Sequence, residues 1–297
     1  MSAETTHSRY PAETARYLAH SMYAKATSPA SKTFALAIAA GFLIGLGFVF
    51  YVTTQMGAAG AGWYGLAKLV AGLSFSVGLI LVVLTGADLF TSTTMTFIPL
   101  VQRRITVGQW AKHWSIVYVG NLVGALLLAG LIVASGTYEQ GHGAWGAAAI
   151  STAMAKVSHT WTQAFFLGVL CNVLVCLAIW LAYTGATTAD KILAIISPVA
   201  LFVATGFEHS VANMFLIPMS IITSRVGGAE FWGSQGVAAA GLSASTAEQT
   251  LTVPSFLLDN LIPVTLGNIV GGGLLIGLFL WWTHVRIDER AAEKAAA

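Results

Sequence analysis

The sequence predicts an all-α integral membrane protein with six transmembrane helices. Two observations support this prediction. Hydrophobic residues make up 56% of the 297 residues and charged residues only 9%, whereas a soluble domain carries roughly 25% charged residues. The apolar residues also fall into six charge-free runs, each near the ~20 residues that a bilayer core requires. The lipid bilayer is therefore the expected solvent of most of the chain.

The six runs form one transmembrane domain, with a polar segment before it and another after it. The first span covers about 34–52, the second begins near Leu69, the third covers 115–134, the fourth 160–183, the fifth begins at Ile192, and the sixth covers 260–282. A polar N-terminal segment, 1–33, precedes the transmembrane domain, 34–283, and a short tail, 284–297, follows it. The N-terminal segment is mixed in charge and has no apolar core of the signal-peptide kind.

The basic residues predict the orientation of the spans. Lys68, Lys156 and Arg225 fall on one side of the membrane, and the other eleven of the 14 Lys and Arg residues fall on the opposite side. Because the basic side of a membrane protein is normally cytoplasmic, both termini are expected in the cytoplasm. The expected location is a bacterial inner membrane.

The two halves of the chain resemble each other weakly. Three segments recur in the same order: GFL at 41–43 loosely matches GVL at 168–170, TGAD at 85–88 matches TGFE at 205–208, and GNLVG at 120–124 matches GNIVG at 267–271. Three spans per half is an odd number, so the halves must have opposite orientations. The sequence therefore predicts an inverted 3+3 repeat, which is common in transport proteins.

The Thr-Gly-x-acid segments predict that the second and fifth helices are interrupted. Asp88 and Glu208 both lie deep inside a span, where polar backbone is tolerated only if it is buried in protein or lines a cavity. Residues 92–94 and Ser210 are candidates to cap the half-helices that follow. Two inward-pointing helix N-termini would then favour an anion over a cation.

His209 is the main candidate for chemistry at these interruptions. An imidazole titrates near pH 6.5 when unperturbed, so His209 could donate a hydrogen bond to a passing carboxylate. It could also lend a proton, so that a weak acid crosses apolar constrictions in its neutral form. The residues alone leave both roles open, beside the ordinary role of a hydrogen-bonded core histidine. Asp88 and Glu208 are expected to be structural, because a carboxylate facing the path would repel an anion.

Other residues near the interruptions have two possible roles each. Thr91 and Ser92 offer hydroxyls to the histidine, to a substrate or to the backbone. Lys156 is either a solvated loop residue or a charge that attracts anions to an outer vestibule. Four bulky residues near the breaks serve either core packing or a constriction that gates by dewetting: Phe75, Leu79, Leu89 and Phe202.

The sequence argues against several other classes of protein. It contains no nucleophile elbow, no His-Glu-x-x-His box and no cluster of metal ligands, so neither an enzyme nor a metal or cofactor site is expected. Cys171 and Cys176 are expected to be free core thiols. The net charge of +2 gives no indication of nucleic-acid binding. A neutral-solute channel of the aquaporin type would require paired Asn-Pro-Ala boxes, which are absent.

Five segments carry a resemblance to the formate/nitrite transporter family. They are GFLIG at 41–45, GADLFT at 86–91, GNLVG at 120–124, GFEHSVANM at 206–214 and NLIPVTLGN at 260–268. The similarity covers residues 30–283. The run EHSVANM at 208–214 is highly specific, whereas the glycine pairs alone are not.

The resemblance implies a homopentamer with one pore per subunit, an aquaporin-like arrangement of helices, and passage of formate. It makes His209 the central pore histidine and Thr91 the threonine of the loop that interrupts the second helix, next to Phe90. It places Leu79 and Phe202, with Phe75 and Leu89, at the constrictions. It places Lys156, Asn172, Glu208 and Asn213 around the pore and vestibules.

The resemblance also bears on partners and leaves the substrate partly open. The N-terminal segment, with Tyr10, Tyr17, His20 and Tyr23, fits a surface amphipathic helix; in the formate branch of the family it resembles a cytoplasmic gate, and in enteric relatives it contacts pyruvate formate-lyase. Nitrite and hydrosulfide differ little from formate in charge and size. A passive channel and a proton-coupled symporter both remain possible from the sequence.

Overall fold

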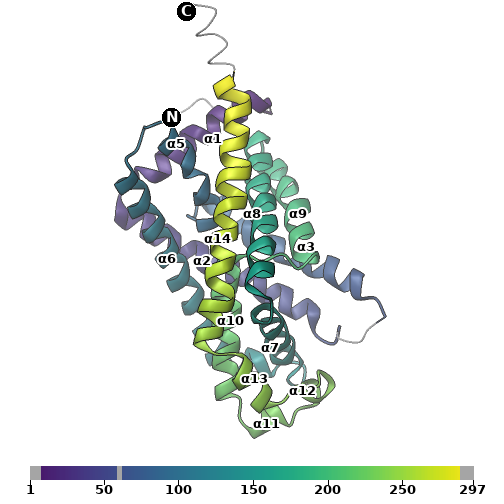
Figure 1. Cartoon of the computed structure of the whole chain (residues 1–297). Helices are drawn as coiled ribbons and strands as arrows, with labels where there is room; N and C mark the ends of the chain where they lie inside the picture. Colours follow the sequence, from purple (N-terminus) through teal and green to yellow (C-terminus); the bar gives the residue numbers. More distant parts are fainter. Residues whose placement is uncertain (1–7, 59–61, 288–297) are drawn as a thin grey trace, which may run out of the picture.

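The computed structural model describes residues 8–58 and 62–287, and the regular secondary structure of this part is entirely helical, with no strand (Figure 1). The predicted all-α membrane class is therefore confirmed. Five helical segments are long and apolar enough to cross a membrane: α2 (Ala30–Gln55), α3 (Tyr64–Thr85), α6 (Val107–Ala134), α8 (Trp161–Thr184) and the final segment, Ser255–Arg286. The fifth predicted span is divided between α9 (Thr188–Ala204) and α10 (Ser210–Val226).

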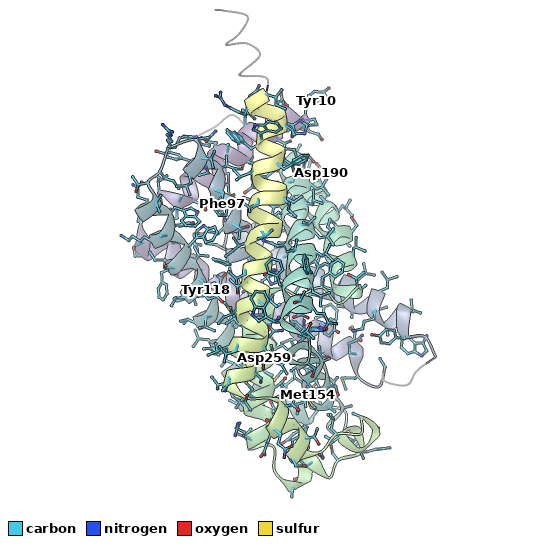
Figure 2. All side chains as sticks on the ribbon, viewed as in Figure 1. Tyr10, Phe97, Tyr118, Met154, Asp190 and Asp259 are labelled. Carbon is cyan, nitrogen blue, oxygen red and sulfur yellow. The ribbon has the colours of Figure 1, made fainter. Side chains whose placement is uncertain are left out.

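The final segment is one continuous helix with turns of two widths. The α-helical turns are α14 (Ile262–Asn268) and α15 (Phe279–Trp281), and wider π-helical turns precede, separate and follow them as η3 (Ser255–Leu261), η4 (Ile269–Leu278) and η5 (Trp282–Arg286). Tyr118 of α6, which is labelled in Figure 2, is hydrogen-bonded to Thr265 of this helix at 3.0 Å.

The shorter helices gather at the two ends of the bundle (Figure 1). α1 (Pro11–Ala26) lies at one end, beside the last turns of the final helix. α11 (Ala229–Trp232), α12 (Gln235–Ala239) and α13 (Ala244–Thr250) lie at the other end, where α7 (Ala144–Val157) contacts α12 and α13; η2 (Thr137–Glu139) precedes α7. Figure 2 likewise places Tyr10 and Asp190 toward the α1 end, and Met154 and Asp259 toward the opposite end.

α1 is packed more tightly than a surface helix would be. Leu18 and Met22 on its inner face are fully buried, and the helix contacts α8 and the end of the final helix. The predicted amphipathic character holds, because Arg16 and His20 of the same helix are exposed. Residues 1–7 of the predicted N-terminal segment and 288–297 of the predicted tail lie outside the described residues.

Both predicted interruptions are present. Gly86 follows the last residue of α3, and Gly206 lies two residues after the last residue of α9. The two glycines have a positive φ, +71° and +77°, which L-residues rarely adopt. An extended stretch follows each glycine, after which α10 begins at Ser210. After the first break the chain continues instead through three short pieces: α4 (Phe90–Thr93), η1 (Thr94–Thr96) and α5 (Phe97–Val101).

The predicted caps of these half-helices are wrong. The N-cap positions are Leu89 and His209, each one residue or more before the expected hydroxyls. The Ser92 hydroxyl donates back to the Leu89 carbonyl at 2.9 Å, so it satisfies an acceptor and caps no N–H group. The Ser210 hydroxyl has no hydrogen-bond partner in the described part of the chain.

Two glycines allow long helices to touch along their backbones. A Cβ on Gly124 of α6 would collide with the Ile38 carbonyl oxygen of α2, and a Cβ on Gly271 would collide with the Val169 carbonyl oxygen of α8. Small residues of this kind permit close helix contact in lipid, where no hydrophobic force drives helices together.

We expect Gly124→Ala to destabilise the protein because α2 and α6 would have to separate. The cost should reach at least the roughly 1–3 kcal/mol typical of overpacking. Gly130→Ala on the same helix is the matched control, since its Cβ would meet open space. Thermal unfolding of the purified variants measures the difference, and equal melting temperatures would show that α6 does not depend on this contact.

Candidate functional site

An asparagine side chain holds the first interruption in place. Asn121 of α6 accepts a hydrogen bond from the Phe90 backbone N–H at 2.8 Å through its side-chain oxygen. Its amide nitrogen donates to the Ala37 carbonyl at 2.8 Å and to the Asp88 carbonyl at 2.9 Å. One buried carboxamide thus satisfies an N–H group and a carbonyl of the broken segment and ties both to α2.

Asn268 does the same at the second interruption. Its side-chain oxygen accepts from the Ser210 backbone N–H at 3.0 Å. Its nitrogen donates to the Gly168 carbonyl at 2.8 Å and to the Glu208 carbonyl at 3.0 Å. We call each of these carboxamides an asparagine clamp. Buried backbone groups freed by a break need such partners, because an unpaired one costs free energy.

The two clamps show which residues of the two halves correspond, and they do so more exactly than the sequence match does. Ala37 and Gly168 occupy the same place in the two clamps. The neighbouring carbonyls of Leu36 and Leu167 accept from the Asp88 and Glu208 backbone N–H groups. The loose sequence match of GFL at 41–43 with GVL at 168–170 is therefore four residues out of register.

The two acidic residues of the breaks are both paired with lysine, as expected for a structural role. Asp88 contacts Lys25 of α1 at 2.9 Å, and Glu208 contacts Lys156 of α7 at 2.7 Å. Burial opposes the charge on Lys25, but the facing Asp88 carboxylate outweighs this effect and raises the pKa of Lys25 above its ordinary value. The first pair thereby fastens α1 to the broken second span.

Glu208 is also saturated with amide donors. Its second carboxylate oxygen accepts from Asn213 at 2.7 Å and from Asn260 at 3.2 Å. Asn260 in turn donates to the Lys156 carbonyl at 3.0 Å. The carboxylate is only 1% exposed, so a buried charge is compensated on every side.

His209 has a defined arrangement of its two ring nitrogens. Nδ1 lies 3.0 Å from the Ala212 backbone N–H, which can only donate, so Nδ1 must accept and carries no hydrogen. The hydrogen of the neutral ring is then on Nε2, which lies 3.1 Å from the Thr91 hydroxyl. His209 is thus both the N-cap of α10 and a hydrogen-bond donor toward the first interruption.

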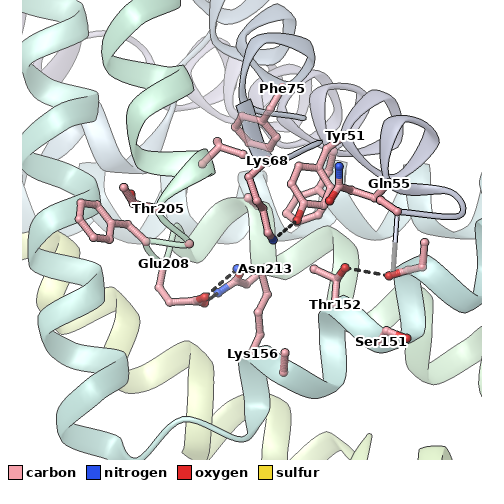
Figure 3. Close-up of a pocket in the computed structure, with 18 of the residues that line it drawn as sticks. Tyr51, Gln55, Lys68, Phe75, Ser151, Thr152, Lys156, Thr205, Glu208 and Asn213 are labelled. Carbon is pink, nitrogen blue, oxygen red and sulfur yellow. Dashed lines mark hydrogen bonds and ion pairs between the residues drawn. The ribbon is translucent and has the colours of Figure 1, made fainter. Parts of the chain in front are cut away.

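A cavity of about 590 Å³ is lined by this histidine and by residues of α7. Its lining comes from α2, α3, α7, α8, α9, α10 and α12 and from the segments that connect them. Figure 3 shows Lys156, Glu208 and Asn213 at one side and Lys68 and Tyr51 at the other. Six of the residues predicted for the path lie in the lining of this cavity: Phe75, Lys156, Phe202, Glu208, His209 and Asn213. The Phe202 ring stacks on His209 with centroids 6.1 Å apart.

The remaining predicted residues lie deeper or elsewhere. Thr91 is fully buried beyond His209, and Asn172 supports it by donating to its carbonyl at 3.0 Å. Leu79 and Leu89 are buried in the core and do not line the cavity. The Phe90 ring packs edge-on against Trp114 and Tyr118 of α6, away from the cavity.

Several important residues escaped the sequence predictions. Asn121 and Asn268 belong to the repeated Gly-Asn segments, in which the sequence analysis assigns no role to the asparagines. An asparagine at the same place in two apolar spans is the signal that could have identified them. Asn260 lies in one of the segments that resemble the family, but the sequence analysis gives this residue no role. Tyr51 and Lys68, which also line the cavity, gave no local signal. Among the described residues no group of His, Cys, Asp and Glu could hold a metal ion.

Comparison with known proteins gives consistent matches over most of the chain. The family model for formate/nitrite transporters matches residues 12–282. The chain is 49% identical to the formate channel FocA of Escherichia coli (strain K12), over 94% of this chain and 95% of that protein. It is 48% identical to FocA of Haemophilus influenzae over 91% and 92%. A solved structure described as a pentameric formate channel with formate bound superposes with a TM-score of 0.80 at 41% identity, covering 86% of this chain and 98% of that one.

We expect Asn268→Ala to destabilise the protein by more than about 3 kcal/mol, because each of several buried backbone groups left unpaired costs roughly 1–3 kcal/mol. Asn121→Ala should behave alike. Gln109→Ala, which removes an exposed carboxamide that only caps α6, is the control and should lose about 1 kcal/mol. A thermal shift of Asn268→Ala no larger than that of the control would contradict the role of the clamp.

Removing the Lys156 ammonium group should leave the buried Glu208 carboxylate without a cationic partner. We expect Lys156→Met to cost about 3–5 kcal/mol, the usual effect of breaking a buried ion pair from one side. The double variant Lys156→Met/Glu208→Gln should recover most of that loss, since no charge is left unpaired. Thermal unfolding of the two single variants and the double variant completes the cycle, and additive effects would refute the coupling.

Proposed function

The chain belongs to the formate/nitrite transporter family, and from this membership we propose that it conducts formate and related small monovalent anions across the membrane. The protein is a multi-pass membrane protein and not an enzyme. We place it in a bacterial inner membrane with both termini in the cytoplasm, as the distribution of basic residues indicates. The cavity and His209 form the route that we assign to the anion.

The family match carries this proposal, and the fixed direction of the His209 ring indicates how this residue would act on the anion. Nδ1 is committed to the Ala212 N–H, so the hydrogen on Nε2 is the one available to a ligand that displaces or joins Thr91. Protonating the ring at Nδ1 would place two hydrogens against each other and break the cap of α10. We therefore favour a neutral imidazole that donates a hydrogen bond to the anion over one that lends it a proton.

The surroundings of His209 support an anionic ligand. The ring lies at the N-terminus of α10, a helix of 17 residues, whose dipole carries about half a positive charge at that end. Glu208 next to it is neutralised by Lys156 and amide groups, so its charge does not repel the ligand. Phe75 and Phe202, whose ring centroids are 5.8 Å apart, would form the apolar constriction in front of the histidine.

Assembly into a homopentamer with one path in each subunit is the expected quaternary structure. The structural relative is described as pentameric, and the long helices of this chain keep apolar faces exposed, as at Leu127, Leu131 and Leu201. These faces would meet lipid or neighbouring subunits. Binding of pyruvate formate-lyase through the N-terminal segment stays a prediction, for which the exposed Tyr10 before α1 and Tyr17 on α1 are the available contacts.

The names of the relatives indicate formate as the substrate, while the family name also covers nitrite. Uptake into vesicles containing the purified protein, measured with formate, nitrite and acetate, tests the proposal directly. Formate uptake above that of protein-free vesicles is the expected result, and its absence at every pH would refute the proposed function.

His209→Asn separates the two tasks of the histidine. Asparagine is a favoured N-cap and should still accept from Ala212, but it is too short to reach Thr91. We expect a folded protein whose formate flux is lower by roughly ten- to a hundredfold, because a hydrogen bond to a charged group contributes about 1.5–3 kcal/mol. The loss should be similar at every pH; a loss confined to acidic pH would indicate proton transfer instead.

A further inference from the structure

Two lysines line the cavity, and they differ in how their charge is balanced. Lys156 of α7 and Lys68 of α3 approach it from opposite sides (Figure 3). Both lie over aromatic rings of α2, Lys156 at 5.9 Å from the Phe48 centroid and Lys68 at 5.7 Å from the Tyr51 centroid. The sequence had singled out only Lys156 as a charge that could draw anions in.

Lys156 contributes little net charge to the cavity. Its ammonium group contacts the Glu208 carboxylate at 2.7 Å, and the two side chains are 13% and 1% exposed. An ion pair of this kind appears from a distance as a dipole, whose field falls off faster than that of a single charge. The electrostatic attraction of a dissolved anion must therefore come mainly from another group.

Lys68 is the cavity lysine whose charge is not cancelled. Its ammonium group donates to the Tyr51 hydroxyl at 3.1 Å and lies 5.5 Å from the Tyr64 ring centroid. Within residues 8–58 and 62–287, no carboxylate lies at ion-pair distance from it. Tyr64 is 67% exposed, so the Lys68 ammonium group beside it lies at the opening of the cavity.

The Tyr51 hydroxyl complements the ammonium group. It accepts from Lys68, and in the described part of the chain it donates to no other protein atom, which leaves its own hydrogen for a ligand. The Tyr51 side chain is otherwise buried, with the residue 5% exposed, and its ring packs edge-on against Phe48 at 5.0 Å. Its hydroxyl is thus held in a fixed position beside Nζ of Lys68.

We propose that Lys68 and Tyr51 form an anion-capture site at the entrance of the cavity, for small planar oxyanions such as formate and nitrite. The ammonium group binds one oxygen of the anion and the phenol hydrogen binds the other, a two-point contact that a carboxylate accepts well. Low-dielectric walls around the cavity concentrate the field of the single charge and raise the local anion concentration. The site rests on the proposed function, because it supplies anions to the path that ends at His209.

The test is formate uptake as a function of concentration by the full-length protein, in vesicles of uncharged phosphatidylcholine at low and at high ionic strength. We expect Lys68→Gln to raise the half-saturating formate concentration roughly threefold at about 10 mM salt, where charges interact over tens of ångströms. The effect should disappear near 1 M salt. Lys68→Arg should resemble the wild type, and Tyr51→Phe should raise the half-saturating concentration by a smaller factor at both salt levels.

Controls keep the result interpretable. Lys112→Gln removes one exposed positive charge from α6, outside the cavity lining, and should leave uptake unchanged. Uptake at saturating formate shows whether each variant is folded. If Lys68→Gln is not folded, the half-saturating concentrations of Lys68→Arg and Tyr51→Phe, compared with that of the wild type, decide whether the capture site exists. Equal half-saturating concentrations in Lys68→Gln and wild type overturn the capture site alone, whereas a wild type that takes up no formate overturns the proposed function and the capture site with it.

Discussion

The structure depends on the satisfaction of backbone groups where a helix is broken inside an apolar bundle. Water is not available there to bond the freed N–H and carbonyl groups, so the protein must supply partners itself. The two asparagine clamps do this with one carboxamide each, by giving an acceptor to the N–H that starts the next helix and donors to two carbonyls. The position of His209, and hence the site, follows from the second clamp.

The clamps also explain why the acidic residues of the breaks are harmless to an anion path. Each break turns its backbone toward an asparagine and its carboxylate toward a lysine of a neighbouring short helix, Lys25 in α1 or Lys156 in α7. The acid thereby fastens a peripheral helix to the broken span. The lysine used in this way no longer contributes a free charge, which is why Lys68 becomes the electrostatically important cation of the cavity.

Much of the fold could be predicted from the sequence, because apolar runs and Thr-Gly-x-acid segments are local signals. The spans and both breaks required nothing more, whereas the role of His209 stays a prediction. The caps at Leu89 and His209 were mispredicted, because hydroxyl residues can equally donate back to carbonyls, as Ser92 does. Tyr51 and Lys68 were missed for a different reason: their importance depends on which other charges are paired, and pairing across helices is invisible in one sequence.

Each asparagine clamp draws its partners from its own half of the chain: Asn121 bonds to residues 37, 88 and 90, and Asn268 to residues 168, 208 and 210. The contact between His209 and Thr91, in contrast, joins the two halves. The bonds of each clamp are thus formed within one half, whereas the hydrogen bond of His209 depends on how the two halves pack against each other. A substitution confined to the contact between the halves would therefore change the partner of His209 and leave both clamps intact.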